Sequence, residues 1–505
     1  MLNFIIGRNN SGKTEKIRAL IAERASENKK CILIVPEQFS FESERSILEK
    51  IGAQKMLNVD ILSFTRLAFV INEQYGKALN KTIDDGTRKV LMSLSLEALS
   101  GKLEYFKRFS SKPALLSNLL TFVTELKQCA VSPDEIAEVS EKTENKSLGK
   151  KLSELSLIAA SYDALVSRSF FDDENLLTIA ADMISETDFF DGKAVYFDAF
   201  CGFTKQERNC IKSILPKAEN VFISLCTDRD LSREGVSVFE NVNSEFSHLK
   251  ECAAEQNVGV SSPEILNVKE DGRSPELVYL EKYLCGEEFK PYKEECNNIV
   301  VCAAGNRADE ADFVACEIKK LLRCNPTLRC RNIAVIERTA GTYDKELSES
   351  FKKYGVPMFE DKRRPIGIQP VMVFVKCLLA LCAEGFSTES FMRLLKTGLT
   401  ALSGDEISEL ENYAFLWNID GSKWRRDFTE NPDGLGFDVT EKSQEKLIRL
   451  NDIRKRSVLP VLAFKKDFEE ADGEKKSRLI YEFLIKNGVT ERLREKIEYL
   501  VSSGD

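Results

Sequence analysis

The chain has 505 residues, of which 43% are hydrophobic and 30% charged, and its formal net charge is −9. This length predicts roughly three or four domains, and the composition is that of an ordinary soluble globular protein. The acidic balance excludes a chain coated in positive charge, although a local basic channel stays compatible with it. No apolar run approaches the roughly 18 residues of a membrane span, and the apolar start leads at once into a polar glycine loop. We therefore expect a cytoplasmic protein with no membrane segment and no signal peptide.

Fourteen cysteines are spread along the chain without any C-x-x-C pair. Many lie inside apolar runs, where cysteine behaves as a small buried hydrophobe. This pattern predicts reduced thiols, in agreement with a cytoplasmic location.

The first fourteen residues carry the strongest motif of the chain. An apolar run, 2–6, leads into G-x-x-x-x-G-K-T, which is made of Gly7, Arg8, Asn9, Asn10, Ser11, Gly12, Lys13 and Thr14. A helical pattern follows over 15–26. Strand, glycine loop and helix in this order predict a phosphate-binding loop whose backbone N–H groups face phosphate oxygens. Lys13 would reach the β- and γ-phosphates of ATP, and the Thr14 hydroxyl would bind Mg²⁺. The alternative is a chance glycine turn before a helix.

Two further strand–helix units follow. Buried-type strands are predicted over 31–36 and 57–62, each followed by a helix. Successive units of this kind predict a parallel sheet with crossover helices, and ligand sites lie at the carboxyl ends of such strands. The loops expected there are the phosphate loop, 36–40 and 63–66.

From about 84 to 169 the apolar spacing becomes helical. Ser132-Pro133-Asp134-Glu135 predicts a helix start, with Ser at the cap and Pro in the first turn. We interpret the segment from about 76 to 170 as a helical insertion into the sheet domain.

The sheet resumes with strands predicted over 193–198 and 220–225. The first ends in Asp198, and an acid at the end of a strand is what a phosphate-loop fold uses to hold Mg²⁺. Asp198 is therefore the candidate metal residue besides Thr14. The alternative is an ordinary strand-end acid that caps the helix starting near Thr204.

A second, smaller β–α unit is predicted after 298. Strands are expected over 299–303, 333–336 and 356–359, with an amphipathic helix over 306–322 and another helix ending at Gly355. From 370 to the end the pattern is helical again.

These pieces resemble the superfamily 1 DNA helicases and, among them, the AddB family of B subunits of bacterial AddAB-type ATP-dependent helicase–nucleases. The resemblance rests on the phosphate loop and on stretches 32–41 (ILIVPEQFSF), 61–67 (ILSFTRL) and 195–207 (VYFDAFCGFTKQE). Stretches 332–339 and 354–357 are similar to the start of a second motor domain. The matches run in order over nearly the whole chain.

The resemblance implies an α/β fold with RecA-like P-loop motor domains, parallel sheets and large helical insertions. The first motor domain would span 1–298, a second would begin over 299–361, and 362–505 would be a helical insertion domain. It implies a DNA-binding, ATP-binding subunit that works as a heterodimer with an AddA-like subunit on double-strand DNA ends in recombinational repair. The B subunit would scan DNA for a hotspot sequence.

Two departures from the family pattern matter. Superfamily 1 motors usually have Glu directly after the metal-binding Asp, where it activates water, but Asp198 is followed by Ala199. Glu207 lies too far along the chain to replace it, so we expect ATP to be bound more surely than it is hydrolysed. The family is also much longer, and its nuclease domain with an iron–sulfur cluster is expected beyond residue 505. This leads us to interpret the chain as an N-terminal part of such a subunit.

The strand-end loops supply the candidates for DNA contact. Gln38, Phe39, Ser63, Phe64 and Arg66 combine hydroxyl, aromatic and cationic side chains, which suits stacking on bases and binding of phosphates. Phe39 and Phe64 are equally compatible with a place in the core. Arg338 could complete the nucleotide site as an arginine finger or be a plain surface residue. The basic clusters 362–364 and 424–426 could contact duplex DNA or the partner subunit, and the alternative is that they are simply solvated.

Three other functions remain open at this point. An autonomous, active helicase would use the same loop, but Ala199 disfavours it. A small-molecule kinase is disfavoured by the helical insertions and the second β–α unit. A scaffold with a vestigial loop would show no stabilisation by nucleotide.

Overall fold

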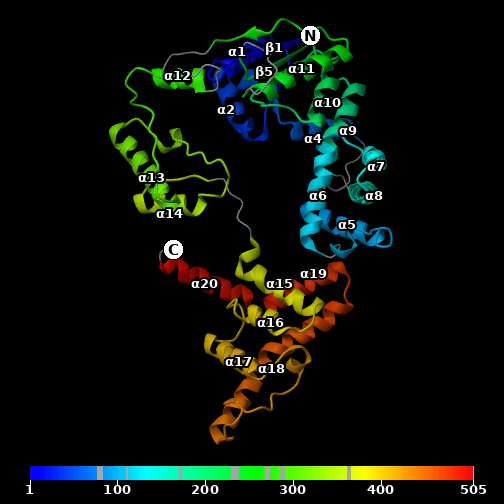
Figure 1. Cartoon of the computed structure of the whole chain (residues 1–505), viewed down its shortest axis with the longest axis vertical. Helices are drawn as coiled ribbons and strands as arrows, with labels where there is room; N and C mark the ends of the chain where they lie inside the picture. The colour runs from blue at the N-terminus through cyan, green and yellow to red at the C-terminus, as the bar shows by residue number, and fades with distance from the viewer. Residues whose placement is uncertain are drawn as a thin grey trace. The chain divides into compact units, whose positions relative to one another are not determined.

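The computed structural model describes residues 1–76, 83–109, 112–169, 173–228, 238–267, 273–284, 290–360 and 366–503. The chain divides into two compact units, Met1–Val301 and Cys302–Asp505 (Figure 1). Each unit has cores of its own, and each is described separately below.

A parallel sheet of six strands forms the centre of the first unit. Its order is β3-β2-β4-β5-β1-β6, and all its pairings are parallel. The strands are β1 (Leu2–Ile6), β2 (Cys31–Ile34), β3 (Val59–Leu62), β4 (Ala194–Phe197), β5 (Asn220–Leu225) and β6 (Glu264–Ile265). The five strands predicted for this domain are confirmed, and the short edge strand β6 is additional.

All but the last of the helices of this domain lie between the strands in sequence, which makes the connections crossovers; the last one follows β6. They are α1 (Lys13–Ser26), α2 (Ser40–Ile51), α3 (Ala53–Met56), α4 (Phe64–Tyr75), α9 (Asp173–Glu186), α10 (Lys205–Ile214), α11 (Glu240–Glu255) and α12 (Pro275–Leu284), with a 3₁₀ turn, η1 (Glu37–Phe39). The fold is thus α/β, as expected for a RecA-like domain with helical insertions.

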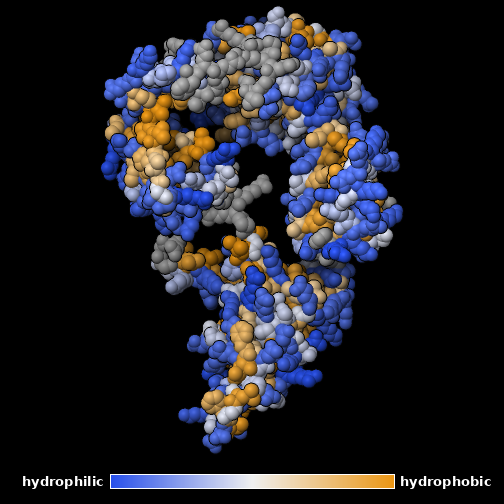
Figure 2. Space-filling model, viewed as in Figure 1, coloured by the Kyte–Doolittle hydropathy of each residue, from blue (hydrophilic) through white to orange (hydrophobic). Residues whose placement is uncertain are grey.

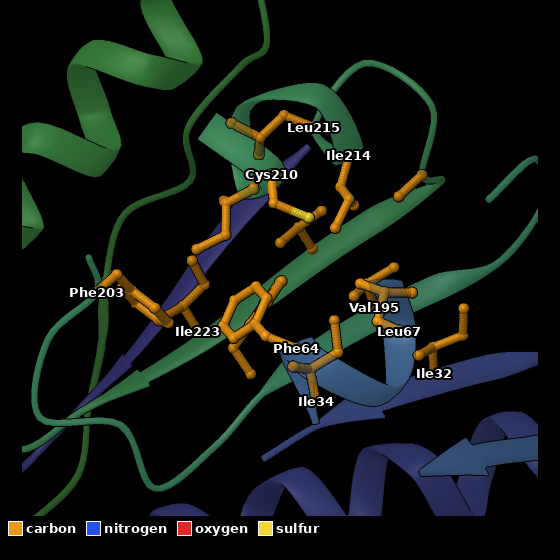
Figure 3. Close-up of a cluster of buried hydrophobic side chains, with 14 of the residues drawn as sticks. Ile32, Ile34, Phe64, Leu67, Val195, Phe203, Cys210, Ile214, Leu215 and Ile223 are labelled. Atoms are coloured by element: carbon orange, nitrogen blue, oxygen red, sulfur yellow. The ribbon is translucent and has the colours of Figure 1, made fainter. Parts of the chain in front are cut away.

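Both faces of the sheet are buried. Alternate residues of one strand belong to two different cores: on β2, Ile32 and Ile34 join the larger cluster, whereas Leu33 joins the smaller one. The larger cluster packs under α4, α9, α10 and α11, and Figure 3 shows part of it around Phe64, Val195 and Ile223. Burial on both faces explains why these strands read as continuous apolar runs rather than as alternating patterns.

The region predicted to be a helical insertion is helical. It holds α5 (Asp85–Ala98), η2 (Lys107–Phe109), α6 (Pro113–Gln128), α7 (Pro133–Lys142) and α8 (Lys146–Ser169). The predicted helix start at Ser132 is confirmed, because Ser132 and Glu135 form a reciprocal capping box at the start of α7. The helices enclose a separate apolar core that includes Met92, Ile158 and Tyr162.

The second unit begins with two packed helices, α13 (Arg307–Cys324) and α14 (Asp344–Tyr354), with η3 (Cys330–Asn332) between them. The strands predicted over 299–303, 333–336 and 356–359 are wrong for this structure, since none of these described residues takes part in a β-ladder. A strand needs a neighbour for its backbone hydrogen bonds, and none of these three described stretches has a strand paired with it. Val301, Ile336 and Phe359 are therefore at least nine-tenths exposed. Figure 2 shows hydrophobic residues gathered on the part of the chain around α13 and α14.

The rest of the second unit is a helical domain with a large core around Trp424. Its elements are η4 (Ile366–Ile368), α15 (Pro370–Ala383), α16 (Thr388–Leu395), α17 (Gly404–Leu416), η5 (Gly421–Arg425), α18 (Glu441–Glu470), α19 (Gly473–Lys486) and α20 (Val489–Ser503). Among the helices of the described ranges, none combines the length and the hydropathy needed to cross a membrane.

Candidate nucleotide site and sheet-edge loops

The predicted phosphate loop joins β1 to α1 at the carboxyl edge of the sheet. Gly12 lies in the left-handed region with φ 89°, directly before the first residue of α1. At Gly7 an added Cβ would contact Ser11 and come within 2.9 Å of the Leu266 carbonyl oxygen. The loop can therefore close only with glycine at both positions, as the motif predicts.

The start of α1 is open to an anion. No side chain caps this helix, whereas Ser63 caps α4 and Thr204 caps α10. The first N–H groups of a helix have no partner within the helix, and together with the helix dipole they favour a negative charge. An uncapped start behind a glycine loop is the geometry that a phosphate group requires.

Lys13 is folded back over the loop. Its Nζ donates to the carbonyl oxygens of Gly7 at 2.7 Å and Arg8 at 2.8 Å, and lies 3.5 Å from Ser11 Oγ. The ammonium group is thus held inside the curve of the loop. Its contact with bound phosphates stays a prediction.

Asp198 follows β4 and is buried, with 5% of its surface exposed. Its carboxylate accepts a hydrogen bond from the Ser224 hydroxyl on β5, and its backbone N–H donates to Ile34 at 3.1 Å. Because β4 and β1 both flank β5, the carboxyl ends of these strands share one edge of the sheet with Thr14. The alternative role, capping the helix near Thr204, is wrong: that cap is made by Thr204 itself with Glu207.

No carboxylate occupies the position after Asp198. Ala199 stands there in a left-handed conformation with φ 65°. Glu207 is engaged in the capping box of α10, where its carboxylate accepts from the Thr204 N–H at 2.7 Å. The expectation that Glu207 does not replace the missing acid agrees with this role.

One arginine that contacts the loop, Arg273, was not among the predicted residues. Arg273 donates from Nη2 to the Asn9 carbonyl oxygen at 3.3 Å. With the Asn10 amide turned to complete the contact, the Asn10 side-chain oxygen accepts from Arg273 Nε at 2.7 Å and Nη2 at 3.0 Å. Arg8 lies 3.7 Å from Glu281, 3.9 Å from Asp228 and over the ring of Phe239. No motif marks Arg273; its position follows from β6, which pairs with β1 and brings the segment before α12 to the loop.

The loop after β2 presents aromatic side chains to solvent. Gln38 is exposed, and Phe39 is 38% exposed, as a DNA contact would need. Phe41, in the first turn of α2, is 77% exposed and was not among the predicted contacts. Its signal in the sequence is an aromatic residue in the second position of a helix that follows a strand-end loop.

The loop after β3 differs from its prediction. Ser63 is buried and accepts from the Arg66 N–H at 3.2 Å as the cap of α4. Phe64 is 6% exposed and packs against Phe197 and Phe203, so its ring is not available for stacking on a base (Figure 3). Ser63 and Phe64 are therefore corrected to structural roles. Arg66 is exposed and paired with Glu44 at 3.3 Å.

The remaining predicted residues lie in the second unit. Arg338 is exposed in the segment before α14, and its role as an arginine finger stays a prediction. In the cluster 424–426, Trp424 is fully buried in the helical core, whereas Arg425 and Arg426 are exposed. The cluster 362–364 lies outside the described residues.

Comparison with known proteins adds the family. A sequence profile described as "ADDB, N-terminal" matches residues 4–281. Relatives named as the B subunit of an ATP-dependent helicase/deoxyribonuclease share 30% identity over the whole chain in Acetivibrio thermocellus and 31% over 99% of it in Clostridium tetani. A relative with the same name in Thermoanaerobacter pseudethanolicus is 30% identical over 98% of the chain.

The aligned region covers 45%, 45% and 44% of these relatives, so the chain spans less than half of their length. The profile match contains the phosphate loop, the sheet with its strand-end loops and Arg273. The chain therefore belongs to the AddB family of ATP-dependent helicase/deoxyribonuclease B subunits.

Proposed function

We propose that the chain is the N-terminal nucleotide- and DNA-binding part of one subunit of a helicase–nuclease that processes double-strand DNA ends for recombinational repair. The observation that carries this proposal is the phosphate loop, in which an uncapped helix start and the folded-back Lys13 face the same curve of backbone. The relatives' names supply the class of complex. An AddA-like subunit is the proposed partner.

ATP with Mg²⁺ is the proposed ligand of the loop. Thr14 is partly exposed in the first turn of α1, and the Asp198 carboxylate accepts a hydrogen bond from Ser224. Oxygen donors of this kind fit Mg²⁺, which usually keeps several waters and binds through one or two protein groups and the phosphates. The ion would neutralise charge on the phosphates.

Arg273 is proposed to bind the nucleotide directly. It contacts Asn9 and Asn10 in the loop, and a guanidinium is suited to bind phosphate oxygens in a bidentate manner. Arg8, tied to Asp228 and Glu281, would hold the α12 side of the site closed over the loop.

Hydrolysis is proposed to be slow. Positioning and activating the attacking water is a large part of the barrier to phosphoryl transfer, and Ala199 has no group for it. A degenerate motor that scans DNA while its partner translocates fits this site better than an autonomous helicase. Robust DNA-stimulated turnover that Lys13→Ala abolishes would instead establish the autonomous helicase.

Nucleotide binding is tested by thermal unfolding. A ligand present at 100 times its Kd stabilises the folded state by about 2.7 kcal/mol, so MgATP should raise the Tm by several degrees. Lys13→Ala should remove this shift, because the ammonium inside the loop is removed. Arg18→Ala, one turn further along α1, is the control and should keep it. If the parent chain shows no shift, the loop is vestigial and the proposal fails.

Single-stranded DNA is proposed to bind at the loop after β2. Phe41→Ala should weaken binding by about 1–3 kcal/mol, the contribution of one base stacked on an aromatic ring. Leu57→Ala is the matched control, because Leu57 is 84% exposed but precedes β3 at the opposite edge of the sheet. Fluorescence anisotropy with a labelled oligonucleotide measures both. Equally weakened binding in the two variants would remove this loop from the DNA path.

Residues 299–361 are proposed to begin a second RecA-like domain. Helices α13 and α14 pack through Ala315, Ile318 and Phe351, and a hollow of about 800 Å³ lies beside them. The hollow is lined by segments that include Ile333 and Val356, which the sequence predicted to be strands. We propose that strands from the part of the relatives that this chain does not span would complete a sheet here. Residues 362–505 would then be a helical insertion into that domain.

A further inference from the structure

A loop in the helical insertion is held in one conformation by a buried carboxylate. Glu154 on α8 is 6% exposed and accepts the backbone N–H groups of Glu104 at 2.8 Å, Tyr105 at 2.7 Å and Phe106 at 3.1 Å. Leu103 and Phe106 point into the apolar core of the insertion. We call residues 103–108, between α5 and α6, the clamped loop (Figure 1).

The clamped loop presents cations to solvent. Lys107 and Arg108 are exposed at its end, and Lys102 is exposed just before it. Helix α8 adds two more cations at the same place: Lys150 pairs with Glu104 at 3.0 Å, and Lys151 lies 5.8 Å from the centre of the Tyr105 ring. Five cations therefore lie on the loop or directly beside it, and the exposed acid of the loop itself, Glu104, is paired with one of them. Such a concentration is unexpected in a chain whose net charge is −9.

We propose that the clamped loop and the start of α8 bind the phosphate backbone of duplex DNA. Lysine and arginine side chains on a fixed loop are the groups that contact phosphates without reading sequence. Binding of single strands uses successive aromatic platforms, but Tyr105 is the only half-exposed aromatic ring of the loop, since Phe106 is buried. The clamp also lowers the entropic cost of binding, because the backbone is ordered in advance.

This inference rests on the proposed function, because duplex DNA is the substrate of that function. It adds a contact surface that lies outside the phosphate loop and outside the strand-end loops. No base contact is expected here, so the affinity should be independent of sequence and steeply dependent on salt.

The test compares two triple variants of the 505-residue chain. Lys107→Gln/Arg108→Gln/Lys151→Gln removes three cations of the surface and leaves the Glu104–Lys150 pair intact. The control, Lys29→Gln/Lys30→Gln/Lys250→Gln, removes three exposed cations elsewhere in the same unit. Anisotropy of a labelled blunt duplex is measured between 50 and 200 mM salt. Circular dichroism and the Tm check that both variants fold.

The surface variant should bind at least about tenfold more weakly. Its plot of log K against log salt should be less steep, by about 0.9 for each phosphate that is no longer neutralised. The control should keep the parent's affinity and slope. Equal affinities and slopes in the parent and the surface variant would overturn the inference while leaving the proposed function intact. A parent that binds single strands but not duplex would overturn it as well. A parent that binds neither kind of DNA, yet is stabilised by MgATP, would refute the DNA part of the proposed function itself.

Discussion

At the scale of single residues, Glu154 holds a loop of backbone in place although no sequence motif marks it. Its carboxylate satisfies three consecutive N–H groups of the clamped loop from a buried position. Glu154→Ala should lower the free energy of unfolding by about 3 kcal/mol, since each buried donor left without an acceptor costs about 1 kcal/mol or more. Glu141→Ala, on the exposed surface of α7, is the control and should change it by less than about 0.5 kcal/mol. Urea unfolding measures both; a decrease below about 1 kcal/mol for Glu154→Ala would show that water replaces the carboxylate.

Some residues of the site are placed by local sequence, and others are placed by contacts with distant parts of the chain. Gly7, Gly12 and Lys13 could be predicted because the loop is a local structure whose backbone demands glycine and whose lysine is six residues from the carbonyl it meets. Phe64 could not, because its burial depends on β4 and on the segment before α10, which come more than a hundred residues later. Arg273 reaches Asn10 across 263 positions, and only the pairing of β6 with β1 brings the two together.

At the scale of elements, α12 is fastened to the end of the first unit by one carboxylate. Glu276, at the start of α12, accepts the N–H groups of Asn297 at 3.2 Å and Asn298 at 3.0 Å and the side-chain amide of Asn298 at 2.7 Å. Its own backbone N–H and the Asn298 amide lower the pKa of Glu276 from the usual 4.5 to about 2. A lowered carboxyl pKa stabilises the fold above the unfolded-state pKa, and this contribution is lost as the pH falls from about 4.5 towards 2.

The pH dependence of unfolding should therefore differ between the parent and Glu276→Gln. The parent should be more stable at pH 7, and its advantage should shrink as the pH is lowered to 3, because the Glu276 carboxylate of the unfolded chain takes up a proton near pH 4.5 while that of the folded chain stays mostly ionised. Glu97→Gln, an exposed residue of α5, should show a much smaller change of this kind. Thermal unfolding at pH 7, 4 and 3 measures the difference. An advantage that is constant with pH would mean that the charge of Glu276 does not contribute.

The strands show why some elements are predictable and others are not. The apolar runs 2–6, 31–34 and 194–197 become strands because each finds parallel neighbours on both sides. Runs of the same appearance at 299–303 and 333–336 do not, because a strand is a property of a pair and no strand pairs with these described residues. Helices are predicted more safely, because their hydrogen bonds lie within one segment, as the capping box at Ser132 shows.

At the scale of the whole molecule, the chain has separate cores on either side of residue 301. The sheet domain is stabilised around residues such as Ile6 and Val195, and the helical domain of the second unit around Trp424 and Leu378. Unfolding need not be a single transition when cores do not share residues. Calorimetry should therefore resolve at least two transitions in the 505-residue chain.

Because the phosphate loop belongs to the first unit, MgATP should raise the transition of the sheet domain and leave that of the helical domain in place. Leu378→Ala, a fully buried change in the helical core, should do the converse: it should lower the helical transition, at a cost of about 2–5 kcal/mol, and leave the nucleotide-dependent shift unchanged. A single transition that responds to both changes would show that the units unfold together. In that case nucleotide bound at Lys13 would stabilise the helical domain as well, and the nucleotide site would be thermodynamically coupled to the whole chain rather than to its own sheet.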